Sequence, residues 1–200
     1  VGSRDEAPGM LGSTHFLEHL LFKGTGTRTA LDIASSFDAV GGESNALTAK
    51  EHTCYYARVL DDDAPMAVDV ITDMVTNALL DPAHLEQERG VILEEIAMDQ
   101  DDPTDVAFEN FVEQLMGANP LGRPIGGTPE EIQAGPRDAV WEHYKRYYTP
   151  DRLVISAAGS LEHSTMVRLV LESLTRYGWD LREGVAPAPR RVRTDSGIVP

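Results

Sequence analysis

The amino-acid sequence predicts an α+β fold, with a mostly antiparallel sheet and helices packed on one side of it. Stretches with helical periodicity are interleaved with only a few strand-like stretches. Two of these strands follow each other across a tight turn near residues 49–51, and strands joined in this way pair antiparallel. The sequence contains no internal repeat, so a repeat architecture is not expected.

The first third of the chain is expected to form two helices followed by a hairpin. The helices cover about 13–22 and 29–40, and a glycine pair ends the second one. The apolar side of this second helix is predicted to consist of Leu31, Ala34, Phe37 and Ala39. The hairpin strands cover about 43–48 and 53–60.

Most of the remaining chain is predicted to be helical. The helices expected after the hairpin cover about 65–80, 82–101, 103–116, 137–147 and 161–177. The segment 128–131 is typical of a capping box, with Thr at the N-cap and Pro in the first helical position. A short apolar strand is predicted over 153–158.

The segment from His15 to His19 carries the clearest chemical signal. On a helix these two residues lie on one face, about one turn apart. Two such imidazoles can grip a divalent metal, and zinc favours imidazole and carboxylate ligands. Glu18 lies between them in the His-x-x-Glu-His order of inverzincins, where a carboxylate can take a proton from a metal-bound water. Structural or solvated roles are expected for the other histidines, which are His52, His84, His143 and His163.

A catalytic zinc needs a third protein ligand, because it keeps three and leaves the fourth position to water. The best candidate lies in a predicted helix, where Glu88, Ile92 and Glu95 share one stripe. A stripe that mixes carboxylates with a large apolar residue fits a buried metal site better than a solvated face. We predict Glu95 as the ligand and Glu88 as a residue that orients a ligand. Glu94 lies about 100° away around the helix and is expected to be solvated or structural.

At these residues the chain resembles the pitrilysin and insulinase type of zinc peptidases, most closely the branch with the mitochondrial processing peptidase and its bacterial relatives. The matching segments are 1–6, 12–25, 41–48, 51–56, 88–96, 121–128 and 148–154. In that family the third ligand is the later member of a Glu-x6-Glu pair at a fixed distance after the second histidine. Glu88 and Glu95 match the pair, and their distance from His19 matches as well.

The resemblance implies a zinc-dependent endopeptidase. In this reading His15, His19 and Glu95 hold Zn2+. Glu18 deprotonates the attacking water and passes the proton to the leaving amine.

The resemblance also implies a peptide-binding role for the first hairpin strand. In that family an extended peptide adds to the exposed edge of the strand that matches 42–48, and backbone pairing gives affinity with little demand on sequence. Asn45 and Ala46 match the family's Asn-Ala pair there and are the predicted substrate-binding residues. The other interpretation is an ordinary edge strand protected by polar residues.

The resemblance further implies one half of a two-domain clamshell. Residues 1–181 are then the zinc-binding N-terminal peptidase domain, with its first strands expected before Val1. Residues 182–200 are a predicted linker toward an absent second domain. In active relatives that half supplies an Arg and a Tyr, so this fragment alone can bind zinc and still fail to cleave. The expected partners are a peptide substrate and a second homologous domain or subunit, with a homodimer as one option.

Composition limits the partners. The chain has 17 Lys and Arg against 33 Asp and Glu, which gives a net charge of −16. This balance argues against nucleic acid and anionic membrane surfaces, and it favours basic peptides, although acidity also serves solubility alone. No apolar run approaches the ~18 residues of a membrane span. The single cysteine, Cys54, excludes an internal disulfide, and we expect a cytoplasmic protein.

Two other functions stay open on the sequence alone. One is a catalytically silent homologue that serves as a binding or assembly subunit. The other is a metal-dependent hydrolase that acts on substrates other than peptides. The intact set of predicted site residues favours the peptidase over the silent subunit, and the edge strand argues weakly against the other hydrolase.

Overall fold

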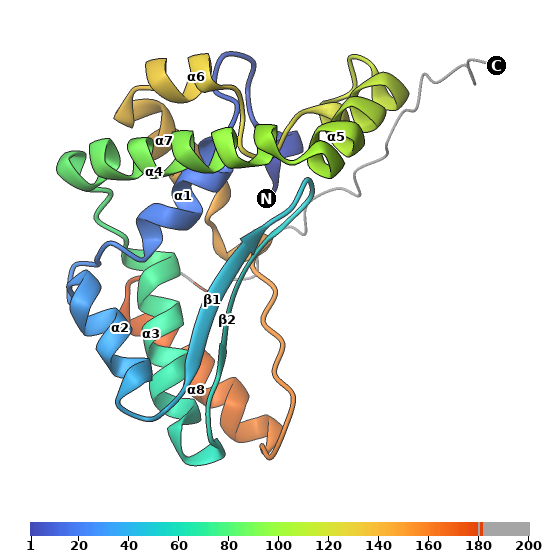
Figure 1. Ribbon diagram of the computed structural model, residues 1–200. Coiled ribbons are helices and arrows are strands. Elements are labelled where there is room, and N and C mark those ends of the chain that lie inside the picture. Colours follow the sequence, from blue (N-terminus) through green and yellow to red (C-terminus); the bar gives the residue numbers. More distant parts are fainter. Residues whose placement is uncertain (180, 182–200) are drawn as a thin grey trace.

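The computed structural model describes residues 1–179 and 181, and its elements are shown in Figure 1. The described strands are β1 (Glu43–Thr48) and β2 (Thr53–Arg58). The described α-helices are α1 (Ser13–Leu21), α2 (Ala30–Asp38), α3 (Ala64–Asn77), α4 (Pro82–Asp101), α5 (Pro103–Met116), α6 (Pro129–Ala134), α7 (Arg137–Tyr147) and α8 (His163–Arg176). Short 3-10 turns are η1 (Ser3–Asp5), η2 (Asp61–Asp63), η3 (Pro120–Gly122) and η4 (Pro150–Arg152).

The predicted α+β class is confirmed, with a small antiparallel sheet and many helices. In β1 and β2, Glu43 lies opposite Arg58 and Thr48 lies opposite Thr53. The turn between them closes with a hydrogen bond from Ala49 N to the carbonyl of His52 at 2.8 Å. Helices α1, α2 and α3 contact the hairpin and lie on one side of it in Figure 1. Within the described residues, the second edge of β1 pairs with no other strand.

Two apolar clusters hold the helices together. The first packs α1 against α4, α6 and α7, and its buried members include Leu17, Leu20 and Leu21 of α1 with Leu85 and Ile92 of α4. The second lies between α2, α3 and the hairpin and includes Ile33, Phe37, Val70 and Met74. Each fully buried side chain of this size stabilises the fold by about 1.5–3 kcal/mol. The first cluster therefore fixes α1 beside α4, the two helices that carry the predicted metal ligands.

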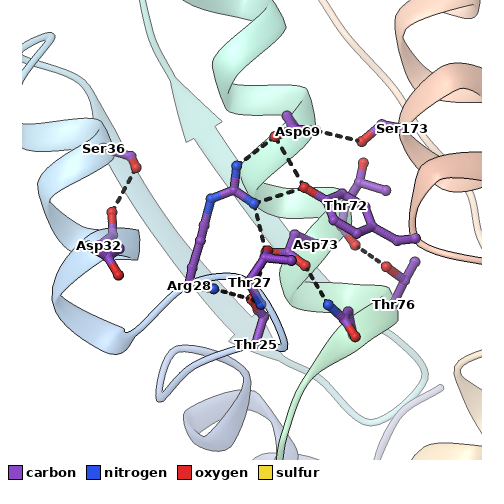
Figure 2. A network of polar contacts seen from close by, with 12 residues as sticks. Thr25, Thr27, Arg28, Asp32, Ser36, Asp69, Thr72, Asp73, Thr76 and Ser173 are labelled. Carbon is purple, nitrogen blue, oxygen red and sulfur yellow. Dashed lines mark hydrogen bonds and ion pairs between the residues drawn. The ribbon is translucent and has the colours of Figure 1, made fainter.

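A buried polar network ties the loop after α1 to α3 and α8 (Figure 2). Asp73 of α3 is fully buried and accepts hydrogen bonds from Thr25 Oγ1 at 2.6 Å, Thr27 Oγ1 at 2.7 Å and the Arg28 guanidinium at 2.7 Å. Arg28 also donates to Asp69 at 2.6 Å. Burial alone would raise the pKa of Asp73, but these hydrogen bonds outweigh it and hold the pKa below its ordinary value. An ionised Asp73 thus fixes the position of the loop that follows α1.

The strand predicted over 153–158 is wrong. The segment forms neither helix nor strand, and Val154 is 89% exposed. A strand needs a hydrogen-bonded neighbour, and none lies beside this segment in the described part of the chain. Its apolar composition predicted a strand for which the fold provides no partner here.

The predicted apolar side of α2 is also wrong in part. Phe37 is buried as expected, but Leu31 is 74% exposed. Ala34 and Ala39 are exposed as well. Ile33 takes the buried side instead, because it lies four residues before Phe37 and shares its helical face.

Two further findings concern the chain as a whole. None of the helices in residues 1–179 combines the length and the apolar character needed to cross a membrane. The linker predicted over 182–200 lies outside the described residues. The division of the chain at residue 181 therefore stays a prediction.

Candidate metal centre

The side chains of His15, His19 and Glu95 converge on one point between α1 and α4. The two histidine Nε2 atoms lie 3.2 Å apart, and Glu95 Oε2 lies 3.7 Å from His15 Nε2 and 3.5 Å from His19 Nε2. Atoms bound to a tetrahedral zinc at about 2.0–2.2 Å lie about 3.3–3.6 Å from one another. The three atoms are thus spaced like three corners of a zinc tetrahedron. No other group of three such ligand residues occurs in the described part of the chain.

The protonation of His15 suits a metal ligand. Burial, followed by the neighbouring His19, lowers the pKa of His15, although Glu95 and Asp99 act in the opposite direction. The neutral imidazole is the form that binds metals. The Nδ1 atom of His15 is buried without a hydrogen-bond partner, which leaves Nε2 as the atom that faces the other two ligands.

Glu88 lies against the second histidine, as expected for a residue that orients a ligand. It is 2% exposed, and its Oε2 atom lies 3.1 Å from His19 Nδ1. Ile92, which is fully buried, lies between Glu88 and Glu95 on the same stripe of α4. The neighbouring Glu94 is exposed, as predicted. The Nζ atom of Lys23 lies 2.7 Å from the other oxygen of Glu88.

Glu18 is held from the hairpin side. Its Oε2 atom accepts a hydrogen bond from the hydroxyl of Thr48, the last residue of β1. The hydroxyl groups of Tyr55 and Tyr148 lie 2.9 Å apart. Burial is the main cause that raises the pKa of both tyrosines, and the charge of Glu18 adds to it. Glu18, which lies on α1, is thus tied to the end of β1 through Thr48.

A buried carboxyl group closes the N-terminal end of α1. Glu6 is 4% exposed, and it accepts hydrogen bonds from the backbone N–H groups of Gly12 at 2.8 Å and Thr14 at 2.7 Å. The first N–H groups of a helix lack partners within the helix, so this carboxyl takes the place of a cap. The hydroxyl of Thr14 lies 3.0 Å from His143 Nε2. His143 is thus a buried structural residue, in line with its predicted role.

Comparison with known protein families identifies the family of this chain. The family described as Insulinase (Peptidase family M16) matches residues 1–129, which is more than half of the sequence. The chain belongs to peptidase family M16. The resemblance drawn from its motifs is thereby confirmed.

Curated relatives include bacterial proteins named as zinc proteases. An uncharacterized zinc protease of Streptomyces coelicolor is 52% identical over 178 residues, which cover 89% of this chain and 39% of that protein. An uncharacterized zinc protease of Mycobacterium leprae is 51% identical over 194 residues, which cover 97% of this chain and 43% of that protein. The chain thus spans about two fifths of the length of these relatives.

Solved structures share the fold. A protease from Helicobacter pylori matches with a TM-score of 0.83 at 24% identity, over 95% of this chain and 46% of that chain. Pitrilysin matches with a TM-score of 0.78 at 24% identity, over 94% of this chain and 21% of that chain. The first half of the periplasmic protease PqqL from Escherichia coli matches with a TM-score of 0.79 at 20% identity, over 96% of this chain and 43% of that chain. The predicted fold, one half of an M16 clamshell, is confirmed.

The predicted substrate residues of this M16 chain lie on β1, whose second edge has no partner strand among the described residues. Asn45 is exposed and Ala46 is half-buried, and they lie opposite Tyr56 and Tyr55 in the hairpin. The side-chain oxygen of Asn45 accepts a hydrogen bond from Ala46 N at 2.8 Å. Their role in binding stays a prediction.

Sequence reasoning missed Lys23 and Thr48, which contact site residues of this M16 chain, and Glu6, which contacts the start of α1. All three lie in segments that match the family, but no strand periodicity connects Thr48 with Glu18. A signal for Lys23 was available, because it lies only four residues after His19, just past the end of α1. Nothing in the local sequence identifies Thr48 as a neighbour of Glu18.

Proposed function

We propose that this chain is the metal-binding half of a zinc endopeptidase that cleaves extended peptides. The observation that carries the proposal is the convergence of His15 Nε2, His19 Nε2 and Glu95 Oε2, spaced 3.2–3.7 Å from one another. The bacterial relatives named as zinc proteases support both the metal and the reaction class.

Each residue of the site has a distinct task. His15, His19 and Glu95 would hold Zn2+, which when bound supplies Lewis acidity toward a peptide carbonyl and makes water more acidic. Glu18 takes a proton from the attacking water and delivers it to the leaving amine. Glu88 accepts a hydrogen bond from the Nδ1–H group of His19, which directs the Nε2 lone pair toward the other ligands.

The substrate proposal rests on the free edge of β1. An extended peptide that pairs with this edge gains backbone hydrogen bonds without strict sequence requirements. Asn45 and Ala46 lie on this strand, and the strand ends at Thr48, the residue that contacts Glu18. The edge therefore leads a bound peptide toward the proposed base.

The proposed partner is a second homologous domain or subunit. The curated relatives are more than twice as long as the part that this chain matches, and pitrilysin and PqqL extend far beyond the matched region. In this proposal the second half covers the substrate over the metal and completes the active enzyme.

Metal analysis combined with peptide cleavage tests the function. The purified chain, alone and together with the remaining part of the full-length protein, is analysed for zinc and assayed on an unstructured peptide with and without a chelator. We expect one zinc per chain and cleavage that the chelator abolishes. Absence of zinc at saturating supply would overturn the peptidase and favour a silent binding subunit.

Matched carboxylate variants assign the roles. Glu95→Gln should lose zinc, whereas Glu94→Gln, one position away and exposed, should keep both zinc and cleavage. Glu18→Gln should keep zinc and lose turnover by at least about 100-fold, since a general base contributes about 100-fold or more. Retained cleavage in Glu18→Gln would remove Glu18 from the reaction.

A further inference from the structure

A lysine reaches the metal centre through a buried carboxylate. The Nζ atom of Lys23 lies 2.7 Å from Glu88 Oε1, and Glu88 Oε2 lies 3.1 Å from His19 Nδ1. The side chain of Glu88 is 3% exposed and that of Lys23 is 31% exposed. The three side chains form a continuous chain that ends at His19 Nε2, one of the three converging ligand atoms.

The burial of Glu88 makes this ion pair different from a surface salt bridge. An exposed pair contributes little, because water screens both charges. A buried carboxylate needs an opposite charge and hydrogen-bond donors to stay ionised and ordered. Lys23 supplies the charge at one oxygen. The other oxygen is left to accept a hydrogen bond from the Nδ1–H group of His19.

The hydrogen bond to Glu88 decides which nitrogen of His19 can bind a metal. A neutral imidazole carries one proton, and a carboxylate beside Nδ1 holds that proton there. Nε2 then presents its lone pair toward His15 and Glu95. Without the lysine, Glu88 loses its ionic partner, and its position beside His19 is no longer fixed.

We propose that Lys23 is a positioning residue of the zinc site, which acts through Glu88 to fix the ring orientation and the tautomer of His19. This inference rests on the proposed zinc site. It assigns Lys23 no contact with the substrate and no proton transfer in the reaction.

Zinc affinity, measured by competition with a chromophoric chelator, tests the proposal without any activity assay. Lys23→Met should weaken zinc binding by about tenfold or more, which is the typical effect of removing a partner of a metal ligand. Lys23→Arg keeps the cation and should stay within about threefold of the wild type. Lys145→Met is the matched control, because Lys145 pairs with Glu142 on the exposed surface of α7, and it should bind zinc like the wild type.

A double-mutant cycle with Glu88→Gln separates positioning from a general effect on the fold. If Lys23 acts through Glu88, Lys23→Met should change the affinity by less than about threefold in the Glu88→Gln background. An equal loss in both backgrounds would overturn the proposal, and so would unchanged or tighter binding in Lys23→Met. A wild type that binds no zinc would instead overturn the proposed function itself.

The tautomer of His19 gives a second test that does not depend on the folding of any variant. In the zinc-free wild type, long-range 1H–15N spectra of the His19 ring should show the proton on Nδ1. A ring with the proton on Nε2 would overturn the proposal.

Discussion

Glu6 carries a carboxyl group in a place that favours its neutral form. Burial is the main cause that raises the pKa of Glu6 from 4.5 to about 7, against the hydrogen bonds from Thr14 and Gly12. The folded chain therefore keeps this proton in a pH range where the unfolded chain has lost it. The stability that Glu6 contributes is full below pH 4.5 and is lost as the pH rises through about 7.

A comparison with Glu6→Gln measures this effect. The free energy of unfolding of the wild type, relative to Glu6→Gln, should fall by about 3 kcal/mol between pH 4.5 and pH 8, as urea titrations can show. His143 acts with the opposite sign, because burial lowers its pKa to about 4 and its contribution is lost on acidification. His143 is present in both proteins, so its effect cancels in the difference. A difference that stays constant with pH would contradict the prediction.

Thr48 should matter for turnover more than for binding. Its hydroxyl donates to Glu18, and a hydrogen bond to a charged group contributes about 1.5–3 kcal/mol. We expect Thr48→Val to lower kcat by about tenfold or more, with zinc content unchanged, because the base loses its fixed position. Thr48→Ser keeps the hydroxyl and should retain most of the activity. An unchanged kcat in Thr48→Val would contradict the prediction, and a loss in Thr48→Ser alone would show that the methyl group, and not the hydrogen bond, is what counts.

At the level of elements, the start of α1 depends on a close contact between two loops. Gly12 has φ +87°, and a Cβ atom there would lie 2.5 Å from the carbonyl oxygen of Gly126 and 2.5 Å from Ile132 Cδ1. The loop before α6 therefore packs directly on the N-terminal end of α1. Only a residue without a side chain allows this approach.

Gly9 provides a control for Gly12. Its φ is +83°, but a Cβ atom would meet nothing within 4 Å. Gly9→Ala should therefore cost about 1 kcal/mol, for backbone strain alone. Gly12→Ala should cost about 1–3 kcal/mol more, since it adds overpacking. Thermal and urea unfolding of both variants test this, and equal costs would show that the loops yield without penalty.

The sequence predicted those elements whose faces follow from local periodicity. The stripe of Glu88, Ile92 and Glu95 and the pair of histidines on α1 needed only the helical repeat, and the structure places them as expected. The contact between Thr48 and Glu18 joins residues 30 positions apart, and no repeat encodes it. Such contacts depend on how the hairpin packs on α1.

Burial was harder to predict than helicity. The periodicity of α5 predicted a helix correctly, yet none of its residues is buried, and Phe108 and Phe111 are 60% and 61% exposed. An amphipathic pattern shows which face is apolar, but it does not show whether a neighbour covers that face. The same reason explains the error at 153–158, where an apolar segment lies without a partner strand.

At the scale of the whole chain, its net charge of −16 should act on substrate capture. In the proposed peptidase, a basic peptide is attracted over long range, and salt screens this attraction. We expect kcat/KM for a basic peptide to fall by about tenfold between about 0.05 and 0.5 M salt. A neutral peptide of the same length serves as the control and should change little. A similar salt effect on both peptides would show that the charge acts on the enzyme rather than on the encounter.

The chain contains two tryptophans, Trp141 and Trp179, and both pack against the apolar cluster that joins α1 to α4. The ring of Trp141 lies 5.7 Å from that of Tyr144 and 5.3 Å from the Arg137 guanidinium. Neither tryptophan lies in the hairpin. Tryptophan fluorescence therefore reports on the packing around α1 and α4, the helices that carry the predicted metal ligands. A change in tryptophan emission follows the loosening of that region. Fraying of the hairpin leaves this emission unchanged and needs a different label.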